Sequence, residues 1–419
     1  MTAMGGVDPY RWLALGIALL CQTSNALASG VIAPLAPLFQ PELGLTKTEV
    51  GFFASAIFVG SWGVLLVAGS LTDRIGVKRM VSMGQVAAGA VMLAMAATGS
   101  FVQALLVMVA VGVARGAILP GASKAIMDWF PRSTRGSAMG LKQAGMPIAG
   151  ILTASILPAL GLALGWRVAI ALVGFLIIVA GIVTFVLYRD PSQSGRAVAH
   201  RESLRTSVGH LLRNPSLWTV SLLATLFVSA QQATIAYIPL YFMEEILVSA
   251  VPDASTRIVA AGGLLALCQA GGIGGRIFWG VVSDRAFRGR RRPVLAIAGA
   301  LSALLSLLVG HLRPDMPLWL TGGLVIAYGI TAIGWNGVYH ALMTETAGAK
   351  YAATGVALSM SLSQFGVIGG PPLFGFIVDL TGTYRPAWLL LTACYAGAAV
   401  VAILSAKSEQ PISEERNRE

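Results

Sequence analysis

The sequence predicts an all-α integral membrane protein whose twelve transmembrane helices form two pseudo-symmetric bundles of six. Three observations predict this class: a charged fraction of only 11%, a series of long apolar segments, and a motif that occurs once in each half. A soluble domain carries about 25% charged residues, so a chain that is 56% hydrophobic has too few charges to cover a water-facing surface. Lipid therefore surrounds most of this chain, and its backbone must satisfy its own hydrogen bonds as helices.

Twelve apolar segments are long enough to cross a bilayer, which takes about 20 mostly apolar residues. They run approximately over residues 11–38, 47–72, 78–98, 101–128, 134–163, 166–188, 215–243, 257–283, 292–311, 317–344, 351–379 and 385–406. The longest hydrophilic stretch between them separates the sixth segment from the seventh. This spacing predicts two halves of six spans each.

The long polar stretch also sets the expected domain boundaries. We expect an N-terminal bundle over 1–188, a cytoplasmic central loop over 189–214, a C-terminal bundle over 215–406 and a cytoplasmic tail over 407–419. With the N-terminus inside, sixteen basic loop residues fall on the inner side and five on the outer side. Because lysine and arginine are enriched in cytoplasmic loops, both termini are predicted to be cytoplasmic. We expect a multi-pass protein of the cell (inner) membrane.

The formal net charge of +11 follows from this topology, so it does not predict a nucleic-acid partner. The three cysteines, Cys21, Cys268 and Cys394, lie far apart in apolar segments, and no metal-ligand spacing occurs. We therefore expect no metal and no cofactor. The expected partners are the lipid bilayer, a small substrate and protons, and we expect the protein to be a monomer.

A short motif, GxxxDR, occurs at the same place in each predicted half. It reads GSLTDR from residue 69, after the second segment, and GVVSDR from residue 280, after the eighth. Paired halves with a site near the midplane are a design of secondary transporters. The sequence resembles the major facilitator superfamily, whose signature loop between spans two and three is similar to GSLTDRIGVKRM. The resemblance covers nearly the whole chain and implies that fold and a transport function, but no particular substrate.

The charged residues of the motif are candidate gating residues. Asp73 and Asp284 can each accept hydrogen bonds from the N-terminus of a neighbouring helix, where the dipole favours an anion. Arg74 can pair with Asp128 at the inner end of span four, and Arg285 is the counterpart of Arg74 in the second half. Such contacts would join the two halves on the cytoplasmic side. The alternative is that these residues are loop charges that only set the topology.

Two arginines lie deep inside predicted spans. Arg276 precedes Asp284 by eight residues, which places it ~12 Å from the inner helix end, and Arg115 lies at or beyond the middle of a ~30 Å core. Ionisable groups at that depth are costly and mark function by default. No aspartate or glutamate lies near mid-depth in any span. An anionic substrate is the simplest partner, because the arginine fork gives a carboxylate two parallel hydrogen bonds.

The stretch GGRIFWGVVSDR around Arg276 resembles the eighth span of the monocarboxylate and oxalate/formate branches of the superfamily. That resemblance implies that Arg276, with Gly280 four residues later, binds the substrate carboxylate. This chain departs from those branches at Gly272, where animal monocarboxylate carriers place an aspartate, and in span eleven, which lacks a lysine. The alternative for Arg276 is a structural arginine bonded to backbone carbonyls near the inner gate.

Span four, RGAILPGASKAIMDWFP, is similar to the anion:cation symporter branch of the superfamily. That branch commonly has glutamate where this chain has Arg115, so the usual proton-coupling carboxylate is absent. Coupling is left open between a proton that travels with the substrate and exchange of one anion for another. The alternative for Arg115 is a helix-packing role.

Several polar residues lie at a depth similar to that of the two arginines and are candidate substrate ligands; they are Asn25, Gln231, Gln269, Tyr328 and Asn336. Each can instead be an interhelical hydrogen-bonding residue. Lys124 and Lys142 lie ~10 Å inside the cytoplasmic edge, and we expect them to snorkel or to pair with Asp128. Contact of either lysine with the substrate stays open.

The sequence therefore predicts a secondary active transporter of a small organic anion, with a monocarboxylate favoured, working by proton symport or anion exchange. The alternative is a proton-coupled drug or multidrug efflux antiporter on the same fold, which needs buried carboxylates to bind cations and exchange protons. A membrane enzyme or sensor is disfavoured, because no catalytic constellation occurs in the spans.

Overall fold

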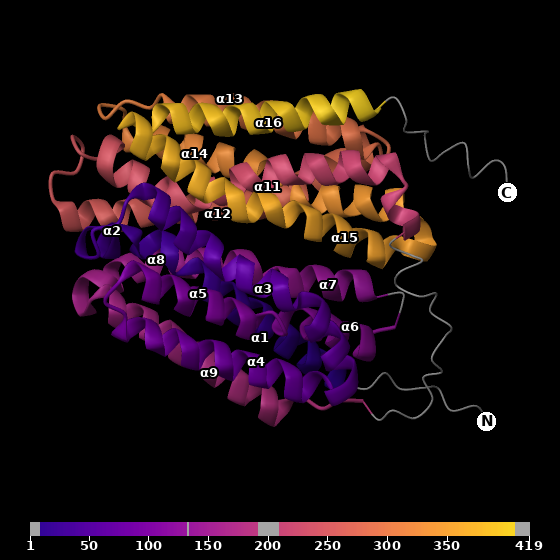
Figure 1. The fold of residues 1–419 in the computed structure, drawn as a ribbon. Coiled ribbons are helices and arrows are strands. Elements are labelled where there is room, and N and C mark those ends of the chain that lie inside the picture. The colour runs from indigo at the N-terminus through magenta and orange to yellow at the C-terminus, as the bar shows by residue number, and fades with distance from the viewer. Residues whose placement is uncertain (1–8, 132–133, 192–208, 407–419) are drawn as a thin grey trace, which may run out of the picture. The chain divides into compact units, whose positions relative to one another are not determined.

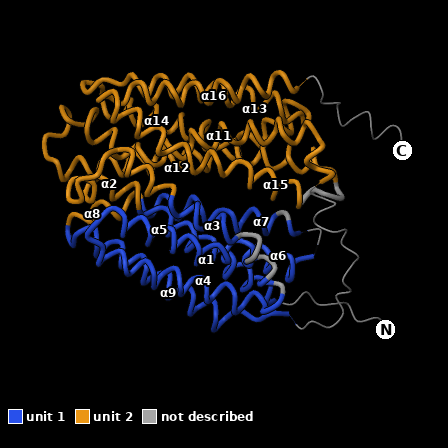
Figure 2. The backbone as a smooth tube through the Cα atoms, viewed as in Figure 1, with its two compact units in different colours: residues 1–31, 56–153, 163–196 blue, residues 32–55, 154–162, 197–419 orange. Residues whose placement is uncertain are grey.

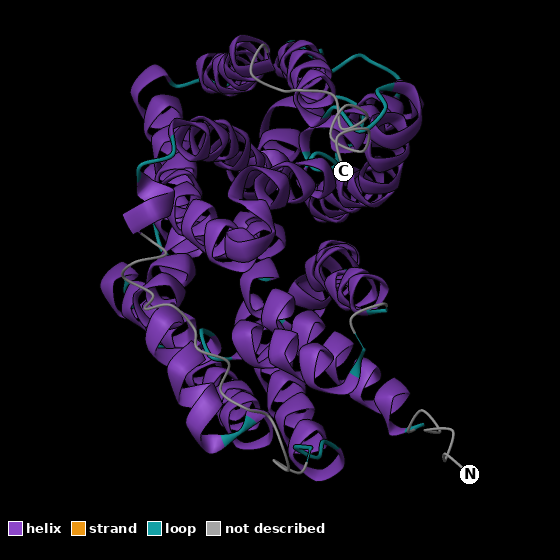
Figure 3. Ribbon diagram, turned by 90° about the vertical axis from the view of Figure 1, so that its right-hand side faces the viewer, coloured by secondary structure: helices purple, strands orange, loops and turns teal. Residues whose placement is uncertain are grey.

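A computed structural model of the chain describes residues 9–131, 134–191 and 209–406. Within those residues every regular element is helical and no strand occurs (Figure 3). Eleven helical segments of the described part are long and apolar enough to cross a membrane. The remaining predicted span, 47–72, corresponds to the 29-residue helix α3, part of whose side chains lie outside the described residues. An all-helical membrane protein is confirmed.

Predicted spans often consist of two consecutive helices (Figure 1). In the first half the helices are α1 (Tyr10–Gly30), α2 (Ile32–Glu42), α3 (Lys47–Ile75), α4 (Val77–Ala94) with the 3₁₀ turn η1 (Met95–Ala97), α5 (Phe101–Arg115), α6 (Ile118–Trp129), α7 (Arg135–Gln143), α8 (Gly145–Leu164) and α9 (Trp166–Leu187). The predicted central loop falls largely, and the predicted tail wholly, outside the described residues.

In the second half the helices are α11 (Pro215–Tyr241) with the π-helical turn η2 (Phe242–Ile246), α12 (Ala254–Val281) with η3 (Val282–Ala286), α13 (Arg291–Gly310), α14 (Leu318–Ala332), α15 (Asn336–Thr381) and α16 (Arg385–Ala406). The backbone of α15 is not helical at Gly348, where φ is 72° and ψ is 160°. Glycine tolerates this left-handed φ. The break lies between the predicted spans 317–344 and 351–379.

The described chain groups into two compact units (Figure 2). Unit 1 contains residues 1–31, 56–153 and 163–196, and unit 2 contains residues 32–55, 154–162 and 197–419. Helix α2 and the first turns of α3 therefore belong to the same unit as α11 to α16. The predicted domain boundary at the central loop stays a prediction.

Unit 1 is packed around α1 and α4. Helix α4 lies against α9 and α5, and α1 lies against α6 and α9. One cluster of buried side chains joins Ala14 and Ile17 of α1 to Val81 of α4. A Cβ atom on Gly89 would collide with the carbonyl oxygen of Gly174, so glycine lets α4 and α9 approach closely.

Unit 2 is packed around α11, which lies against α15 and α16, while α12 lies against α14. The glycines near Arg276 serve this second contact. A Cβ on Gly275 would collide with the carbonyl oxygen of Ile330, and a Cβ on Gly329 would collide with that of Cys268. The glycine-rich stretch of α12 thus allows two backbones to touch in a lipid environment, where close packing holds helices together.

Candidate functional site

Arg115 and Asn25, two of the predicted substrate ligands, meet inside unit 1. Helix α5 ends at Arg115, and its Nε donates a hydrogen bond of 2.9 Å to Oδ1 of Asn25 on α1. The guanidinium carbon lies 5.5 Å from the ring centroid of Phe58. Arg115 is 7% exposed and Asn25 is 4% exposed, so both side chains are buried.

The Arg115 guanidinium keeps unused donors in this buried position. Its Nη1 is buried without a hydrogen-bond partner, and no described carboxylate forms an ion pair with it. An unneutralised buried charge is costly to a fold. Asn25 orients the group through Nε, and Nη1 stays available to donate a charge-assisted hydrogen bond to an anion.

Lys142 and Gln22, which the sequence reasoning did not select as ligands, are also buried in unit 1. Lys142 is 2% exposed, and its Nζ donates to the hydroxyl oxygen of Ser123 at 2.8 Å. Gln22 is fully buried, and neither atom of its amide has a hydrogen-bond partner. The expectation that Lys142 snorkels or pairs with Asp128 is wrong, because packing of α7 encloses the side chain. A signal was present: Gln22 precedes Asn25 by three residues, so both lie on one helix face.

Arg276 lies in unit 2, where its guanidinium makes no hydrogen bond to any described residue. Its side chain is half-buried, and its Nε is buried without a partner. His340 of α15 lies within electrostatic range. The neighbouring Trp279 donates from Nε1 to the carbonyl oxygen of Ile330 at 3.0 Å. Arg276 is thus an available cation, although it is less enclosed than Arg115.

Two further predicted ligands, Gln231 and Asn336, meet in unit 2. Oε1 of Gln231 accepts hydrogen bonds from Nε1 of Trp335 at 2.9 Å and from Nδ2 of Asn336 at 3.2 Å. Tyr328 does not join them: its hydroxyl bonds to that of Thr234 at 2.7 Å. Gln269 is half-buried and has no hydrogen bond to a described residue. The amide pair is thus built from α11 and α15, whereas Tyr328 of α14 bonds to a different residue of α11.

The predicted gating residues have different surroundings in the two halves. Asp284 forms an ion pair with Arg291, which also lies 3.2 Å from Glu345. Arg285 and Arg74 are both exposed. The side chain of Asp73 lies outside the described residues, and Asp128 is half-buried in α6. A pair between Arg74 and Asp128 stays a prediction.

Asp190 takes a role at the signature loop that the sequence reasoning assigned to other aspartates. Its Oδ1 accepts from the backbone N–H of Val77 at 2.9 Å and of Lys78 at 3.3 Å, at the N-terminus of α4. The preceding Gly76 has φ 88°, a left-handed conformation that glycine tolerates. A carboxylate at this position satisfies free donors and complements the helix dipole.

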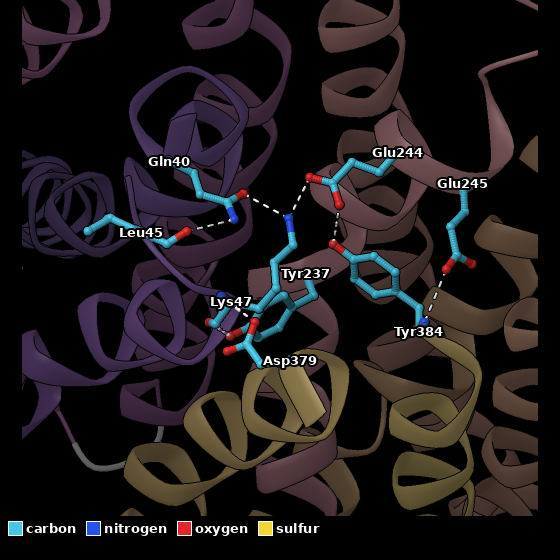
Figure 4. A network of polar contacts seen from close by, with 8 residues as sticks. All are labelled: Gln40, Leu45, Lys47, Tyr237, Glu244, Glu245, Asp379 and Tyr384. Atoms are coloured by element: carbon cyan, nitrogen blue, oxygen red, sulfur yellow. Dashed lines mark hydrogen bonds and ion pairs between the residues drawn. The ribbon is translucent and has the colours of Figure 1, made fainter. Parts of the chain in front are cut away.

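A second polar network joins the α2–α3 turn to α11 and α16 within unit 2 (Figure 4). Nζ of Lys47 lies 2.5 Å from Oε1 of Glu244 and 2.9 Å from Oε1 of Gln40. The second oxygen of Glu244 accepts from the Tyr384 hydroxyl at 2.9 Å. We call Gln40, Lys47, Glu244 and Tyr384 the outer cluster, because the predicted topology places these helix ends outside.

Asp379 of α15 caps the start of α3 beside the outer cluster (Figure 4). Its two oxygens accept from the backbone N–H groups of Lys47 at 2.9 Å and Thr48 at 2.7 Å. Tyr237 donates to the carbonyl oxygen of Lys47 at 2.5 Å. A Cβ on Gly375 would collide with that same carbonyl, so the close approach depends on glycine. Residues from three distant parts of the sequence thus meet at one helix end.

Comparisons with known proteins agree with this architecture. A family model described as Major Facilitator Superfamily matches residues 18–371. The chain is 24% identical to the hexuronate transporter of Bacillus subtilis (strain 168), over 90% of each chain. It is 26% identical to the gallate transporter of Pseudomonas putida, over 95% of this chain and 92% of that one. A bacterial homolog of the human lysosomal transporter Spinster, solved in an inward-facing and occupied conformation, has the same fold, with a TM-score of 0.73, 17% identity and 96% of each chain covered.

Proposed function

The chain belongs to the major facilitator superfamily, and from that premise we propose that it carries a small organic anion across the cytoplasmic membrane by alternating access. Both termini would lie in the cytoplasm, as the basic loop residues predict. The favoured substrates are monocarboxylates, and transport would be proton symport or anion exchange.

The observation that carries the proposal is the buried guanidinium of Arg115 with its free Nη1. A cation exporter needs buried carboxylates, whereas the buried charged side chains among the described residues of unit 1 are the cations Arg115 and Lys142. The relatives named for transport of hexuronate and gallate support the choice of an organic acid, since both of those substrates are carboxylates.

Arg276 would serve as a second cationic side chain that binds the substrate, and the supporting observation is its Nε, which has no hydrogen-bond partner. Gln231 and Asn336 would supply amide groups for the polar part of the substrate. Tyr328 and Gln269 would take lesser parts, because Tyr328 is already bonded to Thr234. The part that these residues of unit 2 play in transport is tested by their own substitutions, such as Arg276→Ala, in the uptake assay described below.

The motif residues Asp73, Arg74, Asp128, Asp284 and Arg285 would gate the cytoplasmic side. The ion pair of Asp284 with Arg291 supports this, because charges at the inner end of α12 already form bonds that a conformational change can break and remake.

The test is uptake of radiolabelled carboxylates by proteoliposomes that contain the purified protein. Arg115→Ala should abolish uptake, and Arg115→Lys should restore little, because lysine lacks the bidentate fork. Arg313→Ala removes the same charge from an exposed loop position and serves as the control. Full uptake by both Arg115 variants would contradict the proposal. Counterflow with and without a proton gradient separates symport from exchange.

A further inference from the structure

Unit 1 contains two buried cations that have no described counter-charge. Lys142 is more deeply enclosed than Arg115, with 2% of its surface exposed against 7%. Its hydrogen bond to Ser123 replaces only part of the hydration that an ammonium group loses on burial. Lys124, the other lysine at a similar predicted depth, is half-buried and interacts elsewhere in the chain. Lys142 is thus the more deeply buried of the two lysines. A bound anion would offset the free-energy cost of burying its charge.

Helix α7 places Lys142 against α1. Ala138 of α7 shares a core cluster with Ala18 of α1, and a Cβ on Gly145, the first residue of α8, would lie 2.9 Å from the backbone nitrogen of Thr23. In both pairs the residue number increases in the same direction along α1 and along the segment formed by α7 and α8. Lys142 lies between them in sequence, so it stands at about the level of residue 21 of α1, and Cys21 lies within electrostatic range of its ammonium group.

The face of α1 that Lys142 approaches also holds Arg115. Gln22 and Asn25 are three residues apart, which makes them neighbours on one helix face with a rise of ~4.5 Å between them. Asn25 holds Arg115 through Nε, and Gln22 is fully buried with neither amide atom bonded. A buried amide without partners is costly unless a ligand satisfies it. Gln22 thus places an unsatisfied amide one turn from the residue that holds Arg115, at about the level of Lys142.

Building on the proposed transport of an organic anion, we propose that Lys142 and Gln22 form a second subsite, which binds a hydroxyl group of the substrate while Arg115 binds its carboxylate. Lysine is a donor only, whereas the glutamine amide both donates and accepts. A hydroxyl group can accept from Nζ of Lys142 and donate to Oε1 of Gln22, which an unsubstituted alkyl chain cannot do. The subsite selects hydroxylated carboxylates over unsubstituted ones.

The test measures binding of gluconate and of propionate to the purified protein by isothermal titration calorimetry, because both are monocarboxylates and only gluconate, which has the longer chain, carries hydroxyl groups. The wild-type protein should bind gluconate more tightly. Lys142→Met and Gln22→Leu should each reduce the ratio of propionate Kd to gluconate Kd by roughly 10-fold or more, since each removes hydrogen bonds to a buried group. Lys124→Gln removes a positive charge in the same unit and should leave the ratio unchanged.

The outcomes separate this inference from the proposed function. The second subsite is overturned if Lys142→Met and Gln22→Leu keep the wild-type ratio while Arg115→Ala abolishes binding of both acids. Failure of the wild-type protein to bind any carboxylate would overturn both proposals. Lys142→Gln keeps a polar side chain of similar length, so a lower ratio for this variant, with an unchanged melting temperature of the unliganded protein, supports ligand contact over a packing defect.

Discussion

Breaking the ion pair between Lys47 and Glu244 should destabilise the fold by a measurable coupling energy. The two side chains are 14% and 29% exposed, and their charged atoms lie 2.5 Å apart. Lys47 also contacts Gln40, while Glu244 accepts from Tyr384. Each charge is therefore held by a neutral partner as well as by its opposite charge.

The burial of the pair sets the expected magnitude. An exposed ion pair contributes about 0–1 kcal/mol, because water and salt screen it. Breaking a fully buried pair costs about 3–5 kcal/mol, because one charge is left without its partner. The pair here is mostly but not fully enclosed, so we expect a coupling energy of about 1–2 kcal/mol, which falls as salt concentration rises.

A double-mutant cycle on Lys47→Met and Glu244→Gln measures this coupling through the free energy of unfolding by denaturant in detergent micelles. The matched control is the cycle of Lys47→Met with Glu245→Gln. Glu245 is the next residue, and its carboxylate bonds to the backbone nitrogen of Tyr384 instead of to Lys47. A coupling near zero in the first cycle, or equal coupling in both, would refute the reasoning.

Four further outcomes follow from the described contacts. Asn25→Leu should lower carboxylate uptake by roughly 10-fold, because Arg115 loses the acceptor that orients it; unchanged uptake in proteoliposomes would contradict this. Asp379→Ala should lower unfolding free energy by about 1 kcal/mol, since the N-terminus of α3 loses its cap, and Asp379→Asn should retain part of that. Gly275→Val should cost about 1–3 kcal/mol through overpacking against α14, or prevent folding, as judged by thermal unfolding. Hydrogen bonds from the hydroxyl and backbone N–H of Thr256 lower the pKa of Asp253, so its capping of α12 is complete near neutral pH and is lost as pH falls through that lowered pKa; amide exchange at the first turn of α12 should rise only in acid.

Much of the architecture could be predicted because it depends on local properties of the chain. Eleven of the twelve predicted spans are apolar helical segments in the described part, and the last predicted span, 385–406, coincides with α16. Hydropathy predicts these helices, because backbone N–H and C=O groups in lipid must form hydrogen bonds within their own helix, whichever helices pack against it. The split of span four was not predicted: α5 ends at Arg115 and α6 begins at Ile118.

The candidate ligands were chosen by depth, and depth alone does not determine a partner. Sequence spacing placed Arg115 and Asn25 at similar levels, but 90 residues separate them, and only helix packing decides that they bond. The same spacing treated Lys142 and Lys124 as equivalent. In the structure Lys142 is 2% exposed and Lys124 is half-buried, a difference that depends on helix packing and that a count of residues cannot show.

The sequence by itself determined an all-helical membrane protein, because hydrophobic length depends on local sequence alone. It also predicted two arginines at mid-depth, where a buried charge is costly. Only the tertiary structure decided which polar side chains stay unsatisfied. In the structure Gln231 is hydrogen-bonded to Asn336, and Tyr328 to Thr234. The amide of Gln22 and Nη1 of Arg115 have no hydrogen-bond partner. The reason is physical: whether a buried group is satisfied depends on the face that a neighbouring helix presents, and helices far apart in sequence set that face.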